Sequence, residues 1–255
     1  MLEKARTLSC DVVVLDLEDS VAPEAKDTAR AAVCGAVKQY GGREVVVRIN
    51  PLASPHSRCD LDAVHAAAPD AILLSKVESA ADIAAVKTSV PVWAMIETPL
   101  GILNAAAIAA GGAECLAMGT NDLLKAMRAQ PLPDRRNLWA ALSQTVISAR
   151  AHGRCVIDGT YNEIGDATGF AESCVQGRAF GFDGKTLIHP GQIEACNRIF
   201  APSADEIAQA RRIIEAFAQN PQLGAIALDG HMVERLHAEE AAHLLALAAA
   251  IESRL

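Results

Sequence analysis

Short apolar runs recur along the chain, and amphipathic stretches separate them. Each run has about four to seven residues, the length of a strand that is buried on both faces of a parallel sheet. The stretches between them carry apolar side chains on one side only, as helices packed against a sheet do. Strand and helix alternate at intervals of roughly 20 to 40 residues, the spacing of repeated β–α units. The pattern predicts seven strands, at 11–17, 44–50, 70–76, from 92, from 116, 154–157 and 179–182.

Nearly every predicted strand ends in a polar or charged side chain. Asp16, Arg48 and Lys76 close the first three strands, and Glu97 and Asp122 follow the fourth and fifth. In a (β/α)8 barrel the carboxyl ends of the strands build the active site, whereas a doubly wound sheet gathers its ligand groups at one crevice. Polar residues at so many strand ends therefore favour the barrel.

A closed barrel of this kind has eight strands, whereas the pattern gives seven. Since the chain opens in an amphipathic helical stretch at 1–8, we expect the first barrel strand to lie upstream of residue 1. After residue 201 the pattern changes to two amphipathic helices, at 204–219 and 233–253, joined by a link that contains Pro and Gly. The predicted fold class is α/β, a (β/α)8 TIM barrel that lacks its first strand and carries a C-terminal helical extension. The predicted domains are a catalytic barrel at 1–200 and an extension or lid at 201–255.

Composition narrows the class of protein. With 51% hydrophobic and 4% aromatic residues, the 255-residue chain favours helices on one buried parallel sheet over an aromatic-rich β-sandwich. The net charge of -8 argues against a nucleic-acid surface, which needs clustered Lys and Arg. The sequence has no long uncharged apolar segment that predicts a membrane span. Seven cysteines without a CxxC pair are expected to be reduced thiols, which predicts a cytoplasmic protein.

Two carboxylates, Glu97 and Asp122, stand at neighbouring strand ends. One such residue alone is better explained as a loop carboxylate or a helix cap. A pair at one rim supplies the hard oxygen ligands of a weakly held Mg²⁺ that keeps positions for substrate oxygens and water. Arg48 at the same rim can hold a carboxylate or polarise a carbonyl. This combination suggests aldol- or Claisen-type chemistry on a small acid.

Six short motifs make the sequence recognisable when they are taken in order. They lie at 14–21, 47–50, 74–79, 96–98, 119–123 and 188–190. Any one motif alone is a weak signal, but together they cover nearly the whole chain. They resemble those of the citrate lyase β-subunit-like family of the HpcH/HpaI aldolase superfamily, which includes malyl-CoA, citramalyl-CoA and citryl-CoA lyases and malyl-CoA thioesterases.

The resemblance implies a role for each rim residue. Glu97 and Asp122 would bind Mg²⁺, and a second layer of acids behind them would orient metal-bound water. Arg48 would contact the substrate carbonyl or carboxylate, and Lys76 would either lie near the acyl-CoA or form a structural ion pair. The second layer consists of Asp16, Glu18 and Asp19, and the backbone N–H groups offered to a substrate carboxylate are those of Gly119, Thr120 and Asn121.

The link before the last helix resembles the family's lid, a segment that commonly places an Asp over the active site of a neighbouring subunit. In this sequence Glu234 stands at that position, and Asn121 stands where many relatives have Glu. The longer Glu side chain displaces its carboxylate by about an ångström, enough to weaken an acid/base step. Glu234 is the candidate that would exchange a proton with the substrate, and the resemblance implies a trimer or hexamer.

The function predicted from this resemblance is that of a Mg²⁺-dependent CoA-ester lyase, which cleaves or forms a C–C bond in a β-hydroxyacyl-CoA. Its partners would be an acyl-CoA and a small keto acid, and neither a nucleic acid nor a membrane. Arg48, Glu97 and Glu234 would be the catalytic residues, with Arg48 and Glu97 also holding substrate. The alternatives are a malyl-CoA thioesterase, a non-catalytic acyl-CoA-binding subunit, and a pyruvate-dependent aldolase that acts on free aldehydes.

Overall fold

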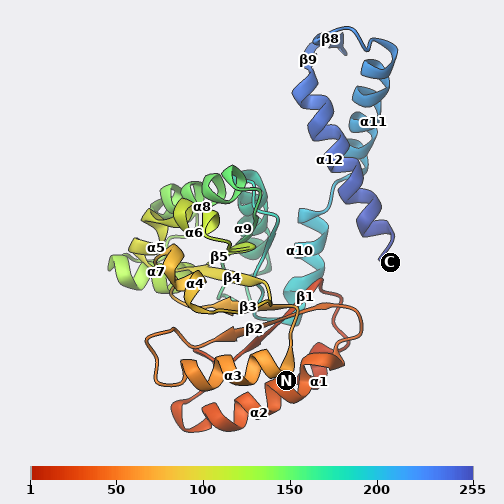
Figure 1. Ribbon diagram of the computed structural model, residues 1–255. Helices are drawn as coiled ribbons and strands as arrows, with labels where there is room; N and C mark the ends of the chain where they lie inside the picture. Colours follow the sequence, from red (N-terminus) through yellow and green to blue (C-terminus); the bar gives the residue numbers. More distant parts are fainter. Residues whose placement is uncertain (1, 255) are drawn as a thin grey trace. The chain divides into compact units, whose positions relative to one another are not determined.

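The computed structural model describes residues 2–254, and the chain divides into two compact units between Cys196 and Asn197. The first unit is built on a parallel sheet in which every strand pairs with the next one in the sequence (Figure 1). Its strands are β1 (Val12–Asp16), β2 (Glu44–Ile49), β3 (Ala71–Leu74), β4 (Val92–Ile96), β5 (Cys115–Met118), β6 (Cys155–Asp158) and β7 (Gly184–Lys185).

The predicted α/β class with a parallel sheet is confirmed, and six of the seven strands lie within two residues of their predicted bounds. The closed eight-stranded barrel is not found among residues 2–254. In that part of the chain β1 pairs only with β2 and β7 only with β6, so the sheet stays open between them. The strand predicted upstream of residue 1 lies outside the described residues.

The seventh strand was predicted in the wrong place. The apolar run at 179–182 is not a strand, because helix α9 (Ala167–Phe180) continues into it. The helix ends at Gly181, whose φ of 94° puts it in the left-handed conformation that glycine adopts without steric cost. The strand follows at Gly184–Lys185, where its register pairs Lys185 with Asp158.

Helices cover the outer face of this sheet, and apolar side chains fill its inner face. Alternate residues on the central strands point inward and form one cluster that includes Val46, Leu73, Trp93 and Ala117. None of the helices within residues 2–254 is long and apolar enough to cross a membrane. The α-helices besides α9 are α1 (Leu2–Ala5), α2 (Lys26–Ala36), α3 (Ser57–Ala67), α4 (Ala80–Ala85), α5 (Pro99–Leu103), α6 (Ala105–Ala110), α7 (Thr120–Met127), α8 (Trp139–Ala151) and α10 (Ile193–Phe200). Short 3-10 turns occur at Pro23–Ala25, Val37–Gln39, Arg136–Leu138 and Pro190–Gln192.

The second unit is a pair of helices joined by a β-hairpin. Helix α11 (Ala204–Gln219) begins at Ser203, whose hydroxyl accepts a hydrogen bond from the Glu206 N–H while the Glu206 carboxylate reaches back. The hairpin consists of antiparallel β8 (Ala225–Leu228) and β9 (His231–Glu234), and α12 (Arg235–Glu252) follows it. The sequence had predicted a link without strands. Asp229 and Gly230 between the strands have φ of 54° and 79°, which is the two-residue turn that closes a hairpin.

Candidate functional site

Charged side chains from the carboxyl ends of β1 to β5 meet at one rim of the sheet. Continuous ion pairs link four carboxylates to two cations, and these six residues form what we term the rim cluster. The strands run parallel in sequence order, so their ends fall at the same edge and bring distant residues together. The cluster consists of Asp16, Glu18, Arg48, Lys76, Glu97 and Asp122.

Arg48 and Asp16 face each other across neighbouring strands in direct register. The guanidinium donates from Nε to Asp16 Oδ1 at 2.7 Å and from Nη2 to Oδ2 at 2.6 Å, a two-pronged contact. Burial would raise the pKa of Asp16, but the hydrogen bonds and charge of Arg48 outweigh it and lower that pKa to about 2. Arg48 Nη1 also lies 3.1 Å from Glu18 Oε2. The structure therefore places Asp16 as the partner that orients Arg48.

Lys76 lies between the remaining acids. Its Nζ is 2.9 Å from Glu18 Oε1, 3.6 Å from Asp122 Oδ2 and 3.8 Å from Glu97 Oε1. Burial works against the charged amine, but the contacts with Glu18 and Glu97 outweigh it and raise the pKa of Lys76 above its usual value. Of the two roles that the sequence left open for Lys76, the ion pair is the one that the geometry displays.

Glu97 is only 2% exposed at the end of β4, and burial raises its pKa to about 7 although Lys76 opposes the shift. Its position depends on Gly119, because a Cβ at that residue would lie 2.4 Å from the Glu97 Cβ. Asp122 is in the first turn of α7 and keeps about a quarter of its side chain exposed. The proposed metal pair thus joins one buried and one accessible carboxylate.

The other predicted substrate contacts lie at the start of α7. The backbone N–H of Gly119 donates to the Ile96 carbonyl at 3.0 Å within the sheet. Thr120 is buried, and the Asn121 amide exchanges two hydrogen bonds with the Asn162 amide, at 2.8 and 3.2 Å. The loop after β6, which carries Asn162, is therefore fastened to the residue that precedes Asp122.

One predicted acid of the first unit, Asp19, takes part in none of the ion pairs of the rim cluster, and Glu234 belongs to the other unit. Asp19 is exposed in the turn after β1 and acts on Arg48 only through its charge. Glu234 belongs to the second unit, where it caps α12 and its backbone N–H donates to His237 Nδ1 at 2.9 Å. The catalytic role assigned to Glu234 stays a prediction.

A second group of charges, missed in the sequence, surrounds Asp158 at the end of β6. Arg135 Nη1 donates to both Asp158 oxygens at 2.8 and 2.9 Å, and Lys185 Nζ donates to Oδ2 at 2.8 Å. The side chains of Asp158 and Lys185 are fully buried, and burial lowers the pKa of Lys185. These three residues form what we term the β6–β7 ion network. The signal was present, since Asp158 closes a predicted strand as Glu97 and Asp122 do.

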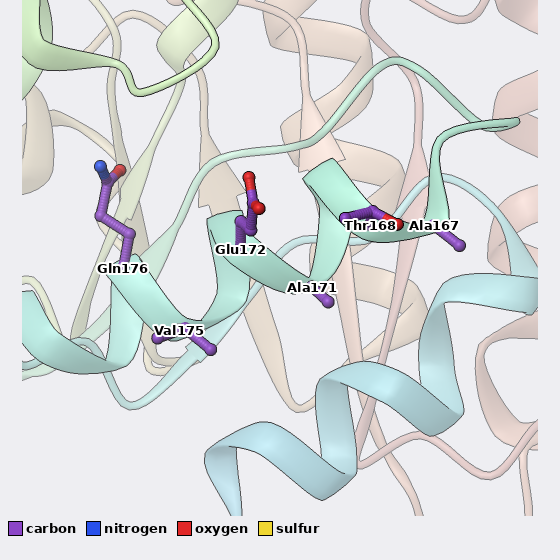
Figure 2. A pocket seen from close by; sticks show the side chains of 6 residues that line it. All are labelled: Ala167, Thr168, Ala171, Glu172, Val175 and Gln176. Carbon is purple, nitrogen blue, oxygen red and sulfur yellow. The ribbon is translucent and has the colours of Figure 1, made fainter.

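A surface hollow of about 550 Å³ lies along α9, apart from the residues of the rim cluster (Figure 2). All of its lining side chains come from one helix, and the set contains one carboxylate and no cation. It offers a ligand no opposing wall and no convergent polar groups. The chemistry therefore points to the rim cluster. The lining residues are Ala167, Thr168, Ala171, Glu172, Val175 and Gln176.

Comparison with known proteins agrees with the resemblance seen in the motifs. Residues 1–190 match the family described as HpcH/HpaI aldolase/citrate lyase. A (3S)-malyl-CoA thioesterase of Cereibacter sphaeroides is 45% identical over 98% of this chain and 90% of its own length. Citrate lyase subunit beta of Haemophilus influenzae is 33% identical over 92% of this chain and 87% of its own.

The fold also matches solved structures. The protein CitE of Mycobacterium tuberculosis, solved in complex with magnesium, acetoacetate and coenzyme A, superposes with a TM-score of 0.82 at 32% identity. The match covers 94% of this chain and 90% of that one. The predicted relation to citrate lyase β-subunit-like proteins is confirmed, and so is membership of a family of enzymes.

The predicted carbon–carbon lyase activity is wrong. The relatives at 44–45% identity over 98% of the chain are (3S)-malyl-CoA thioesterases, whereas the citrate lyase subunits share 32–34%. The motifs at the strand ends could not separate the two activities, because the resemblance assigns the same metal ligands and the same arginine to both.

Proposed function

The chain belongs to the HpcH/HpaI aldolase/citrate lyase family, and from this premise we propose that it is a Mg²⁺-dependent thioesterase acting on malyl-CoA or a close analogue. The choice of hydrolysis is supported by the 45% identity to (3S)-malyl-CoA thioesterases. The observation that carries the proposal is the rim cluster, where Glu97 and Asp122 both lie within 4 Å of one cationic nitrogen. Two carboxylates that share a cation in this way suit a metal site.

The charges of the rim cluster fit Mg²⁺. Its four carboxylates exceed its two cations, Arg48 and Lys76, by two, so a dication balances them when all are ionised. Within residues 2–254 no three His, Cys, Asp or Glu side chains gather as a complete metal cage. Mg²⁺ commonly uses one or two carboxylates and keeps its waters, so Glu97 and Asp122 suffice as its protein ligands. When bound, it would polarise the thioester carbonyl and acidify water.

The chain's own residues would bind and orient the malyl group. Asp16 holds the positively charged guanidinium of Arg48 at the rim. Arg48 is therefore the residue that would bind a carboxylate or carbonyl of the substrate. The Gly119 N–H already donates to the Ile96 carbonyl. The backbone N–H groups free to bind a substrate carboxylate at the start of α7 would therefore be those of Thr120 and Asn121. Glu97, with its pKa raised to about 7, can hold or release a proton near neutral pH. Water adds to the thioester carbonyl, and the thiolate of CoA leaves as the product acid forms.

A product assay tests this proposal. Malyl-CoA is incubated with the protein and Mg²⁺, and free thiol, malate, glyoxylate and acetyl-CoA are measured in the same sample. We expect thiol and malate in equal amounts, and loss of turnover when EDTA is added. Acetyl-CoA serves as the control substrate, because it lacks the hydroxy acid that the rim would hold. Glyoxylate and acetyl-CoA as products, or no turnover with malyl-CoA, citramalyl-CoA or citryl-CoA, would contradict the proposal.

Three wider expectations from the sequence belong to the same proposal. A barrel at 1–200 would carry the chemistry and the segment at 201–255 would serve as a lid, in a trimer or hexamer. A cytoplasmic location is supported by seven cysteines that are all free thiols. CoA and a keto acid are proposed as ligands because CitE was solved with acetoacetate and coenzyme A. Size-exclusion chromatography with light scattering measures the oligomer.

A further inference from the structure

The ammonium of Lys76 lies where three carboxylates converge. Its Nζ is within 4 Å of Glu18, Asp122 and Glu97, and the last two are the proposed Mg²⁺ ligands. A cation at this position offsets the mutual repulsion of the three acids, two of which are almost fully buried. The side chain of Lys76 therefore supplies the positive charge that the acids need when no metal is bound.

The backbone of Lys76 holds the residue over Glu97. Its N–H donates to Glu97 Oε1 at 2.8 Å, so the same carboxylate contacts both ends of the residue. The φ of Lys76 is 53°, in the left-handed region that a residue with a side chain adopts at a cost of about 1 kcal/mol. A turn with this geometry would favour Gly or Asn, and the contacts of Lys76 offset that cost.

Mg²⁺ and this ammonium would compete for the same oxygens. A dication held by Glu97 and Asp122 would stand close to Nζ, where like charges repel strongly in a partly buried site. About a third of the Lys76 side chain is exposed, so the ammonium has a path away from the acids toward water. The flexible four-carbon stem of lysine allows this movement, which the fixed fork of Arg48 against Asp16 does not.

We propose that Lys76 is a built-in counter-ion of the metal-free protein, and that Mg²⁺ binds by displacing its ammonium from Glu97 and Asp122. This inference rests on the proposed function for the identity of the metal. Lys76 then sets how tightly Mg²⁺ binds, because the ion has to replace an existing ion-pair arrangement. It is a positioning residue for the site, distinct from the two ligands.

Calorimetric titration of EDTA-treated protein with Mg²⁺ tests the competition. We expect the Mg²⁺ dissociation constant to fall about tenfold in Lys76→Met, which keeps the length of the side chain and removes its charge. Lys76→Arg keeps the charge and should bind Mg²⁺ as the wild type does. Lys87→Met is the matched control, because Lys87 is an exposed lysine with a left-handed φ of 47° that belongs to no rim contact.

Stability without metal provides a second readout. In EDTA the melting temperature of Lys76→Met should fall below that of Lys76→Arg and Lys87→Met, since only Lys76→Met leaves Glu97 and Asp122 without the ammonium as counter-ion. The stabilisation gained on adding Mg²⁺ should be largest in Lys76→Met. Equal melting temperatures in EDTA for all three variants would overturn the counter-ion role.

Lysine labelling of the wild-type protein keeps the test independent of whether a variant folds. Acetic anhydride, followed by peptide mass spectrometry, should modify Lys76 several-fold faster when Mg²⁺ is present, with Lys87 unchanged. Labelling of Lys76 that ignores Mg²⁺, or a Lys76→Met variant that binds Mg²⁺ no tighter than the wild type, would overturn displacement. Either result leaves the proposed function standing if malyl-CoA is hydrolysed. A wild-type protein that binds no Mg²⁺ would contradict both the proposed Mg²⁺ dependence and the displacement of Lys76.

Discussion

The rim cluster and the β6–β7 ion network are built from the same side-chain types at the carboxyl ends of neighbouring strands, yet their charge balance is opposite. The rim cluster has four acids and two cations, and Asp122 and Lys76 keep 27% and 37% of their side chains exposed. The network has one acid, Asp158, between Arg135 and Lys185, and Asp158 and Lys185 are fully buried.

This difference separates a binding site from a structural one. In the network the fully buried Asp158 carboxylate accepts hydrogen bonds from Arg135, Lys185 and the Gly159 N–H, so no carboxylate is left accessible to a ligand. In the rim cluster the acids outnumber the cations, and one buried oxygen, Glu18 Oε2, accepts no hydrogen bond although Arg48 lies 3.1 Å away as its ion partner. An excess of partly accessible carboxylates attracts a cation, whereas a closed ion network holds strands together.

The largest expected effect is on catalysis at the rim. The double substitution Glu97→Gln and Asp122→Asn should lower kcat for malyl-CoA hydrolysis by about 10³-fold or more, because it removes both charged metal ligands. Steady-state kinetics at saturating Mg²⁺ measure it, with circular dichroism as the control for folding. Activity within tenfold of the wild type would show that the chemistry lies elsewhere.

The next largest effect is on stability at the network. Asp158→Asn should lower the free energy of unfolding by about 3–5 kcal/mol, because it leaves two buried cations without their acid. Urea denaturation measures the change. The control is Asp62→Asn, which breaks the exposed pair with Arg58 and should cost about 0.5 kcal/mol. Similar losses in the two variants would erase the contrast between buried and exposed ion pairs.

A smaller effect with a pH signature is expected for Asp16. Its pKa is lowered to about 2 in the folded protein, so its contribution is present above pH 4 and is lost as the pH falls toward 2. Asp16→Asn should therefore cost about 2 kcal/mol at pH 7 and about half of that at pH 3. Urea denaturation of wild type and variant in EDTA at both pH values measures it. A pH-independent difference would mean that Arg48 does not depend on the ionised carboxylate.

The smallest effect concerns the link between the two regions. Asn162 follows β6, and its amide pairs with Asn121 beside Asp122. Asn162→Ala removes two exposed hydrogen bonds and should cost about 0.5 kcal/mol in the free energy of unfolding. We expect KM for malyl-CoA to rise a few-fold with kcat almost unchanged, because the start of α7 loses a support. A fall in kcat alone would place Asn162 in the chemical step.

Much of the rim was predictable because parallel strands deliver their ends to one edge. An apolar run followed by a charge located Arg48, Lys76, Glu97 and Asp122, and the structure brings these four together with Asp16 and Glu18. Their individual contacts were not predictable, because a strand end fixes where a side chain starts and leaves open which neighbour it meets. The pairing of Asp16 with Arg48 depends on the register of β1 and β2.

The misses have physical causes as well. The apolar run at 179–182 has the composition of a strand, but its first two residues complete the last turn of α9 before Gly181 ends that helix. The sequence pattern predicts a plain link where the second unit has a hairpin, although Asp229-Gly230 after the apolar run that ends at Leu228 is a hairpin signal. The role of Arg135 depends on a loop that carries it to Asp158, and no periodic pattern describes that path.

Residue 119 tolerates no side chain, and this limits which substitutions the site can accept. A methyl group there would meet the Glu97 Cβ at 2.4 Å and its Oε2 at 2.6 Å, so even alanine would push the buried carboxylate out of place. Directed evolution that randomises residue 119 should return glycine from nearly every active clone. Widening the specificity toward bulkier thioesters would have to begin at other positions, such as the loop that carries Asn162.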